Sequence, residues 1–209
     1  MGIKHRMDGV FMYRYKFRPW ETAALLALCI TLLSGTWAAS RQQRLASGLI
    51  RLHVIAVSDE EAEQALKLRV RDAVLQYLRP LLSSAADADA ARVLLERALP
   101  GVKAAAEEAS EGRKVTVSLG PEDYPLRRYG GFRLPAGRYE SLRVTLGEGA
   151  GHNWWCVVFP TLCLEAAETE PLQSALDEED YALVTEDSGY ALRFWLVDAW
   201  GDLMNRLRP

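Results

Sequence analysis

Residues 151–163 read GHNWWCVVFPTLC, and this stretch decides how the rest of the chain is organised. If it forms a strand, alternate side chains point to opposite faces, so Trp154 and Trp155 lie on different sides of it. The residues that follow each tryptophan along its own face are apolar as well. A strand that is apolar on both faces is expected inside a sheet, with a layer of structure on each side.

Two cysteines in this stretch, Cys156 and Cys163, can meet only if the chain reverses between them. In a continuous strand their Cα atoms would lie about 20 Å apart, far beyond disulfide reach. Proline cannot adopt the positive φ of the usual two-residue hairpin turns, so Phe159-Pro160 cannot form one of them. Either a cis Phe159-Pro160 bond in a type VI turn or a looser loop must close the reversal.

The first 39 residues have the layout of an export signal. A basic leader at 1–18 is followed by an apolar core at 23–33 and by small residues at 34–39. The basic end stays in the cytoplasm, which places the rest of the chain across the membrane. Since the apolar run at 20–39 is also long enough to span a bilayer, a cleaved signal and an uncleaved membrane anchor both stay open.

This layout divides the chain into three segments. Residues 1–39 are the export signal or anchor, the polar residues 40–48 are a linker, and residues 49–209 form a single extracytoplasmic domain. Outside the cytoplasm a disulfide between Cys156 and Cys163 is the favoured state, and two buried free thiols are the alternative. The protein is secreted if the signal is cleaved, and contacts the membrane through its N-terminal segment if it is not.

Composition fits a folded exported domain and excludes some partners. The 209 residues are 49% hydrophobic and 25% charged, which is ordinary for a globular protein. The net charge is −3, and because the first 39 residues carry five basic and two acidic side chains, the remainder carries −6. A surface of this sign argues against binding to nucleic acid and against adsorption to anionic lipid.

Residue patterns after the linker predict a strand that leads directly into a helix. Residues 49–57 are rich in branched aliphatic side chains, which favours a strand. The helix that follows begins with Ser58 and Glu61 at the spacing of a capping box, and Pro80 is expected to end it. A second helix is expected at 84–99, broken by Pro100 and continued by a third helix or a kinked extension.

The second half of the domain is expected to supply most of the sheet. Alternation predicts strands at 115–119 and 139–146, with a long loop between them. Residues 192–207 predict an amphipathic helix whose apolar side packs on the domain. That side consists of Leu192, Trp195, Leu196, Ala199, Leu203 and Leu207. The predicted fold is therefore α+β, with helices packed on a mixed, mainly antiparallel sheet and preceded by an N-terminal signal or anchor helix.

No motif in the chain indicates a catalytic, metal or cofactor site. Residues 147–151 read GEGAG, but a strand and not a helix follows, so a tight hairpin connection is predicted instead of a phosphate loop. His53 and His152 are the only histidines beyond the signal, and no metal-binding or nucleophile motif accompanies them. We therefore expect no catalytic residues, no metal and no cofactor.

Two motifs together resemble the stage II sporulation protein R family. Residues 50–59 (IRLHVIAVSD) running into 64–74 (QALKLRVRDAV) are similar to its opening signature, and 151–163 is similar to its second one. Between them, YG at 129–130 and AGRY at 136–139 stand in the family order. The resemblance covers roughly residues 49–163. Two departures are Val57, where the family has asparagine, and Thr161, where it has a second proline.

The resemblance implies a signalling protein and not an enzyme. Family members are exported from the forespore of a sporulating bacterium into the intermembrane space. There they activate a membrane-embedded aspartic protease, which processes the sigma-E precursor. The residues expected to contact this partner, or else to form core, are His53, Ser58, Asp59, Asn153, Trp154 and Trp155. Two alternatives are an exported enzyme, hydrolytic or thiol-active, that uses His53 or Cys156, and a membrane-tethered structural domain.

The predicted disulfide has a modest expected effect on stability. Its loop is short, so the chain-entropy relation gives a stabilisation of about 2.5 kcal/mol. Replacing both cysteines with serine (Cys156→Ser with Cys163→Ser) should lower the free energy of unfolding by this amount while the domain still folds, as measured by urea denaturation. A thiol-active enzyme predicts instead that Cys156→Ser abolishes function in a folded protein.

Overall fold

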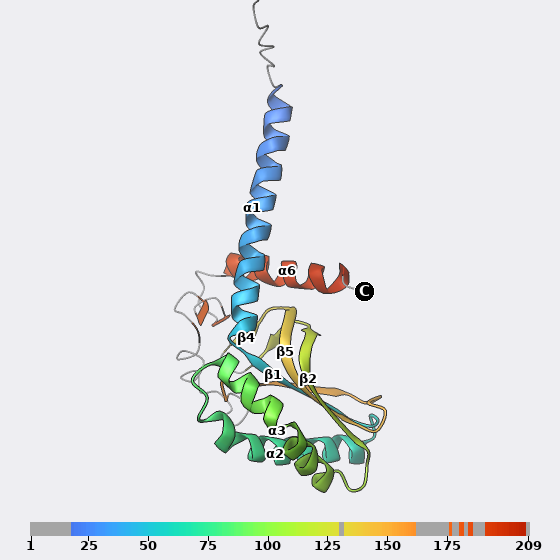
Figure 1. Ribbon diagram of the computed structural model, residues 1–209. Helices are drawn as coiled ribbons and strands as arrows, with labels where there is room; N and C mark the ends of the chain where they lie inside the picture. Colours follow the sequence, from blue (N-terminus) through green and yellow to red (C-terminus); the bar gives the residue numbers. More distant parts are fainter. Residues whose placement is uncertain are drawn as a thin grey trace, which may run out of the picture. The chain divides into compact units, whose positions relative to one another are not determined.

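The computed structural model describes residues 18–129, 132–161, 176, 180–181, 184–185 and 191–207 (Figure 1). The chain divides into two compact units, Met1–Ser34 and Gly35–Pro209. Helix α1 (Pro19–Ser47) begins in the first unit and ends in the second. It is long and apolar enough to cross a membrane, a property that a signal sequence near the N-terminus shares. This confirms the predicted N-terminal apolar helix as a candidate signal or anchor.

Residues 40–48 differ from the predicted linker, because α1 continues through Ser47. The last turns of the helix are part of the second unit, where Ala38 and Leu45 are buried. Arg41 is also buried and pairs with Asp180 over 2.9 Å. Apolar side chains recur seven residues apart at 38 and 45, so one face of the helix stays apolar beyond the end of the apolar run. The segment was predicted to be a linker because most of its residues are polar.

The sheet has four strands in the order β2-β5-β1-β6. They are β1 (Ile50–Ile55), β2 (Val115–Tyr124), β5 (Gly137–Leu146) and β6 (Asn153–Phe159). β1 runs parallel to β5, while the β1–β6 and β2–β5 pairs are antiparallel. The mixed, mainly antiparallel sheet and the α+β class are therefore confirmed. A separate two-stranded ribbon joins β3 (Arg127–Arg128) to β4 (Arg133–Leu134).

Helices α2 (Glu61–Leu82) and α3 (Ala88–Ala109) lie side by side on one face of the sheet (Figure 1). Together they enclose the first core, which takes alternate residues of β1 such as Leu52 and Val54. Of the two arrangements expected beyond Pro100, the separate third helix is wrong, since α3 is one helix that extends across the proline. Its buried stripe continues through the proline, so packing outweighs the lost hydrogen bond.

The start of α2 differs from the predicted capping box. The helix begins at Glu61 with Glu60 as its N-cap, and no side chain caps it. Ser58 lies before the cap, and its hydroxyl accepts only a long 3.4 Å bond from the backbone of Glu60. The carbonyl of Ser58 instead accepts a 2.8 Å hydrogen bond from the Gln64 side chain. The capping prediction was therefore wrong by two residues.

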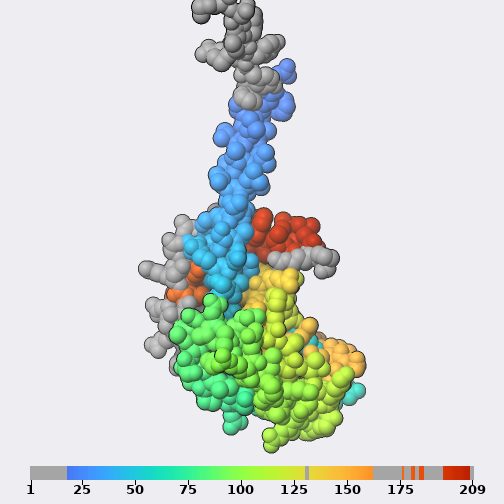
Figure 2. All heavy atoms as spheres, viewed as in Figure 1, coloured from blue at the N-terminus to red at the C-terminus, as the bar shows by residue number. Residues whose placement is uncertain are grey.

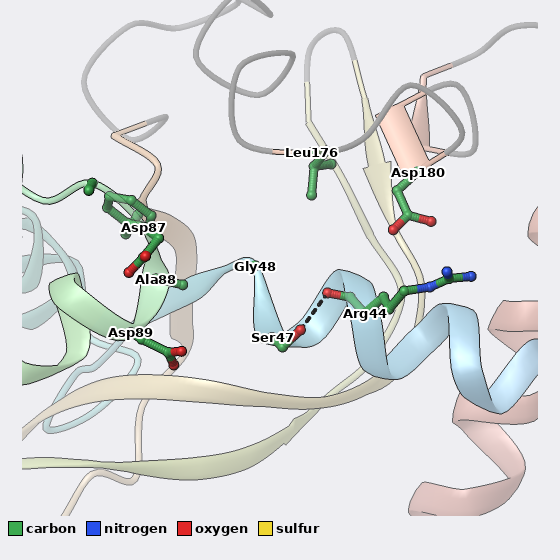
Figure 3. A pocket seen from close by; sticks show the side chains of 10 residues that line it. Arg44, Ser47, Gly48, Asp87, Ala88, Asp89, Leu176 and Asp180 are labelled. Atoms are coloured by element: carbon green, nitrogen blue, oxygen red, sulfur yellow. Dashed lines mark hydrogen bonds between the residues drawn. The ribbon is translucent and has the colours of Figure 1, made fainter.

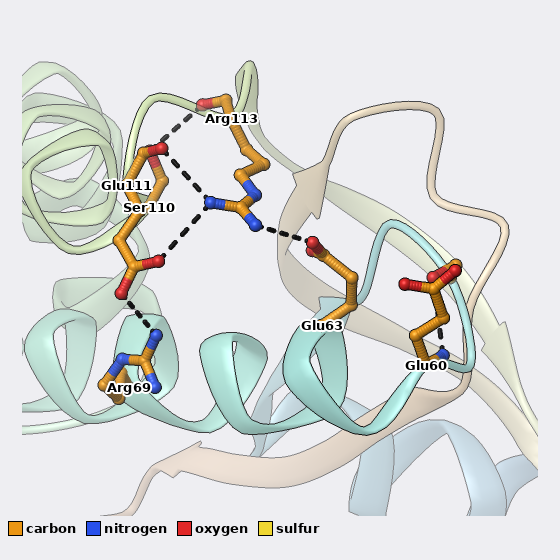
Figure 4. Close-up of polar contacts among 7 residues, drawn as sticks. Glu60, Glu63, Arg69, Ser110, Glu111 and Arg113 are labelled. Atoms are coloured by element: carbon orange, nitrogen blue, oxygen red, sulfur yellow. Dashed lines mark hydrogen bonds and ion pairs between the residues drawn. The ribbon is translucent and has the colours of Figure 1, made fainter.

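Charged side chains join α2 to the turn that follows α3 (Figure 4). Arg113 in this turn pairs with Glu63 of α2 over 2.7 Å, and Arg69 of α2 pairs with Glu111 over 2.5 Å. Glu111 adopts a positive φ of 51°, so the chain leaves the helix through the left-handed region. These contacts hold the two helices in register over the sheet.

β6 lies at an edge of the sheet and not inside it, which corrects the interior position predicted for residues 151–163. Layers do cover both of its faces, because Trp154 packs on the first core and Trp155 on a second cluster. The predicted hairpin at 147–151 was also wrong, since β1 separates β5 from β6. The connection crosses the end of β1, with positive φ at Gly147 (56°) and Gly149 (66°). The Phe159-Pro160 bond is cis, one of the two arrangements expected.

β2 extends to Tyr124, through residues predicted as loop. Pro121 sits inside it, opposite Glu140 of β5. Proline cannot donate to a sheet ladder, but β2 is an edge strand, where one side of the backbone needs no partner strand. The extension matters for the site, because it brings Glu122 and Tyr124 onto the sheet.

The C-terminal helix α6 (Ala191–Leu207) packs against the rest of the second unit with a face other than the predicted one. Val197 and Gly201 are buried, whereas Trp195, Leu203 and Leu207 of the predicted inner side are exposed. The Asp198 carboxylate accepts a 2.8 Å hydrogen bond from the backbone of Ala136. Asn205 donates to the carbonyl of Tyr124 over 3.1 Å. Polar anchors therefore outweigh the apolar stripe in orienting this helix.

Gly201 is required for this packing, which gives a test of the docking of α6. A Cβ at this position would lie 1.7 Å from the carbonyl oxygen of Ala136, so the backbones would have to separate. We expect Gly201→Ala to lower the free energy of unfolding by about 1–3 kcal/mol, despite the higher helix propensity of alanine. Urea denaturation measures this. The control Gly120→Ala adds a Cβ with nothing within 4 Å and should have little effect; equal effects would contradict the packing.

Candidate functional site

The face of the sheet opposite α2 and α3 carries a buried cluster of polar and aromatic side chains. Leu52 and Val54 of β1 belong to the first core. The side chains that alternate with them, Arg51 and His53, therefore point to the opposite face. The second core forms here from residues of the sheet, the end of α1, α6 and the segments next to the sheet. Its buried members are Ala38, Leu45, Leu49, Tyr124, Phe132, Leu134, Tyr139, Val157, Val184 and Val197. Two of the buried charged or titratable groups of the chain are therefore neighbours on one strand.

Arg51 is fully buried and surrounded by tyrosines. Its guanidinium lies 3.9 Å from the ring centroid of Tyr124 and 5.0 Å from that of Tyr139. Nη2 donates a 2.5 Å hydrogen bond to the hydroxyl of Tyr129, while Nε and Nη1 are buried without a hydrogen-bond partner. Among the described residues no carboxylate forms an ion pair with it. Cation–π contacts thus take the place of a salt bridge.

Burial affects the titration of the groups around Arg51. It raises the pKa of the Tyr124, Tyr129 and Tyr139 hydroxyls, against the opposing effect of the Arg51 charge. Arg127 packs over Trp155, with 3.6 Å from its guanidinium to the ring centroid, and burial lowers its pKa. The tyrosines therefore stay neutral hydrogen-bonding groups throughout the physiological range.

His53 belongs to a hydrogen-bonded chain beside this cage. Its Nδ1 lies 2.9 Å from Oε1 of Glu122, which also pairs with Arg143 over 3.0 Å. The Ser141 hydroxyl donates to Oε2 of Glu122 over 2.8 Å, and the Tyr124 hydroxyl lies 2.7 Å from that of Ser141. Burial raises the pKa of Glu122, but the bonds from His53 and Ser141, together with the His53 and Arg143 charges, outweigh it and hold the pKa below its ordinary value.

The order of these groups does not provide an activated nucleophile. In a serine–histidine–acid triad the histidine lies between the other two, whereas here the carboxylate of Glu122 lies between His53 and Ser141. A cavity of about 140 Å³ reaches Glu122 and Ser141, but His53 is not among its lining residues. The described side chains also include no group of three or more His, Cys, Asp or Glu that could hold a metal ion.

A larger cavity lies between the end of α1 and the start of α3 (Figure 3). Two of its three acidic side chains have structural roles. Asp87 caps α3 by accepting from the backbone of Ala90 over 2.8 Å, and Asp180 pairs with Arg41. These two carboxylates are therefore used in the fold.

The junction between β1 and α2 is the exposed part of the predicted contact surface. Asp59 accepts a 2.6 Å hydrogen bond from the backbone of His152 and pairs with its side chain over 2.5 Å. Lys67 donates to the His152 carbonyl over 3.0 Å, and burial lowers its pKa. Gly151 permits the close approach, because a Cβ there would lie 2.3 Å from the Ser58 carbonyl oxygen. We call Ser58, Asp59, His152, Asn153 and Trp154 the junction surface.

The structure separates the six predicted contact residues into two groups. Asp59 and Asn153 are exposed, and Ser58 and Trp154 are partly exposed, all at the junction surface. His53 is buried, with its ring centroid 5.3 Å from that of Trp155 on the side of the second core. Whether any of them contacts a partner stays a prediction. The Val57 departure leaves an apolar side chain packed on the first core.

Sequence reasoning missed the groups that share the buried cluster with His53. Arg51 is two residues from His53 in a predicted strand. Because side chains alternate between the two faces of a strand, the sequence already placed both on one face. Glu122 and Tyr124 stood in a predicted loop, so no pattern linked them to His53. Cys156 is buried and disulfide-bonded, and Cys163 lies outside the described residues, so the pairing of these two stays a prediction.

Comparison with known proteins identifies relatives of this chain. The family model described as Stage II sporulation protein R (spore_II_R) matches residues 46–169. Stage II sporulation protein R of Bacillus subtilis (strain 168) is 36% identical over 142 residues, which are 66% of this chain. The chain spans 63% of the length of that relative. No solved structure matches.

The Glu122 network predicts how stability depends on pH. Because the folded-state pKa of Glu122 lies below its ordinary value of 4.5, its contribution is present at neutral pH and is lost as the pH falls through the folded pKa. Glu122→Gln should therefore lower the free energy of unfolding by about 1–3 kcal/mol at pH 7 and by less in acid. Urea denaturation across the acid range measures this.

Glu140→Gln is the matched control, since the side chains of Glu122 and Glu140 are 19% and 20% exposed. Glu140 pairs with Arg92 at the surface, so its loss should cost less than about 1 kcal/mol. An effect of Glu122→Gln that stays constant from neutral to acid pH would show that the charge of Glu122 is not what stabilises the fold.

Proposed function

Because this chain belongs to the stage II sporulation protein R family, we propose that it is an exported sporulation signal that activates a membrane-embedded aspartic protease across the septum. The activated protease then processes the inactive sigma-E precursor. The observation that carries the proposal is the family match over residues 46–169, which includes most of the described second unit. Activation, export and the partner all belong to the proposal.

Export is supported by the apolar helix at the N-terminus. Pro19–Ser47 is a candidate membrane span, and the same feature suits a signal sequence. In the proposal this segment takes the domain from the forespore into the intermembrane space. There it either is cleaved, which releases the domain, or remains as an anchor.

We propose that the domain acts by binding and not by catalysis. In the buried cluster Glu122 accepts from His53, Ser141 and Arg143, while Nε2 of His53, like Nε and Nη1 of Arg51, is buried without a hydrogen-bond partner. The histidine is enclosed by Tyr124 and Trp155 rings, and His53 is absent from the lining of the described cavity beside Glu122. These features support a structural task for the cluster, namely to fix the positions of β1, β2, β5 and β6.

The junction surface is the proposed contact with the protease. It presents an exposed carboxylate, imidazole and amide from Asp59, His152 and Asn153, all held by the backbone at the end of β1. His53 and Trp155 face each other across the β1–β6 pair, two residues further from this end of β1 than Ile55 and Asn153. To activate the protease, this surface must bind the active state more tightly than the resting one.

We infer that the disulfide joins Cys156 to Cys163. Cys156 is disulfide-bonded and Cys29 is a free thiol, which leaves Cys163 among the three cysteines of the chain. A cross-link immediately after β6 suits a domain that works in the oxidising space outside the cytoplasm.

A pair of variants at opposite edges of the sheet tests the contact surface. Asn153 and Thr116 are both exposed, on the edge strands β6 and β2. Asn153→Arg places a long cation in the junction surface and should reduce processing of the sigma-E precursor at least tenfold when the chain is co-expressed with the protease and the precursor. Thr116→Arg should leave processing unchanged.

Two results would contradict the proposal at different levels. If the unaltered chain gives no processing above a sample that contains the protease alone, the activator function is wrong. If the unaltered chain activates and both arginine variants activate equally, the function stands and the junction surface is not the contact. Far-UV circular dichroism confirms that both variants are folded.

A further inference from the structure

Helix α6 exposes a stripe of apolar side chains to solvent. Trp195, Leu203 and Leu207 are 60%, 47% and 66% exposed. Ala199 and Arg206 are exposed as well, so positions 195, 199, 203, 206 and 207 follow one side of the helix at helical spacing. Figure 2 shows this helix at the surface of its unit. A stripe of this kind on a soluble domain marks a surface that something covers.

The stripe cannot turn inward, because the other side of α6 is fixed. Val197 is fully buried, and Gly201 lies against the backbone of Ala136. Asp198 and Asn205 are bonded to the backbone of Ala136 and Tyr124. A rotation that buried Trp195 would break these contacts. The helix is therefore held with its apolar side outward.

The position of α6 along the chain indicates what covers the stripe. Trp200 of α6 packs against Gly35, where a Cβ would lie 3.0 Å from the indole ring. Gly35 lies near the end of the apolar run at 20–39, two residues after the exposed Leu33. Within the second unit, α6 is thus attached to α1 near the end of the apolar run of the candidate membrane span. A helix attached at that point lies at the level of the membrane surface.

We propose that α6 lies in the outer surface of the membrane that α1 spans, with Trp195, Leu203 and Leu207 in the boundary between head groups and acyl chains. Tryptophan prefers this boundary. Arg206 on the same side pairs with Asp202 over 2.7 Å and its exposed guanidinium lies at the polar edge of the stripe. The net charge of the domain opposes adsorption by electrostatics, so burial of these apolar side chains provides the attraction.

Lipid suits the stripe better than a second protein. A stable protein interface takes about 800 Å² from each partner, which is more than the exposed parts of three large side chains on one helix. The inference rests on the proposed anchoring by α1 but not on activation of the protease. An α6 that lies on the membrane would fix the orientation of the domain above it.

Spin labels on the full-length chain test the inference without any protease present. The chain is synthesised cell-free with vesicles of phosphatidylethanolamine and phosphatidylglycerol, which contain no signal peptidase. One sample carries the label on Cys29, within α1. The other two have Cys29→Ser and carry it on Leu203→Cys or Val93→Cys, where Val93 is 43% exposed on α3. Power-saturation electron paramagnetic resonance compares collisions with oxygen and with a water-soluble nickel chelate.

We expect the label at 203 to lose its accessibility to the nickel chelate, as the label at 29 does, and the label at 93 to keep it. A label at 203 that stays accessible while the one at 29 is shielded overturns the inference and leaves the anchor intact. Shielding at 203 that disappears when the protein is diluted in excess lipid also overturns it, since a second copy then covers the stripe. Accessible labels at both 29 and 203 overturn the anchoring and the inference together.

Discussion

The buried charge of Arg51 is the constraint on which the rest of this fold depends. Its guanidinium is removed from water and is held by the rings of Tyr124 and Tyr139 and by the hydroxyl of Tyr129. These aromatic residues come from β2, from β5 and from the segment beside the β3–β4 ribbon. A buried guanidinium that lacks some of these partners would cost free energy, so these elements must assemble together around β1. The central strand therefore specifies the arrangement of its neighbours.

This constraint explains why the two sides of the sheet differ. The side of α2 and α3 is an apolar core, built by helical stripes on alternate strand residues. The other side is polar at its centre and is closed by the end of α1 and by α6, through buried residues such as Leu45 and Val197. The part of α1 that belongs to the second unit therefore contributes directly to this core, through Ala38 and Leu45.

Local sequence was enough to predict the four strands of the main sheet, the helical layer and the fold class. Alternation marks β5 and the first half of β2, branched aliphatic side chains mark β1, and apolar residues on both faces mark β6. Local sequence failed where tertiary contacts override local pattern. Pro100 and Pro121 lie inside regular elements because packing and an edge position tolerate them. The docked face of α6 is set by Asp198 and Gly201, which no hydrophobic pattern could reveal. The same holds for the site: Glu122 reaches His53 only through a strand that was predicted to be a loop.

In the proposed function the domain acts by contact. Glu122 is bonded to its buried neighbours His53 and Ser141, and the exposed Asp59, His152 and Asn153 lie together at the end of β1 beside the start of β6. The most direct test is a titration of the purified protein against vesicles that contain the protease and its substrate. The account predicts that processing saturates when the protein has occupied the protease and that processing stops when the protein is withdrawn. Full processing at amounts far below those of the protease, persisting after withdrawal, would contradict it, because that is the behaviour of an enzyme.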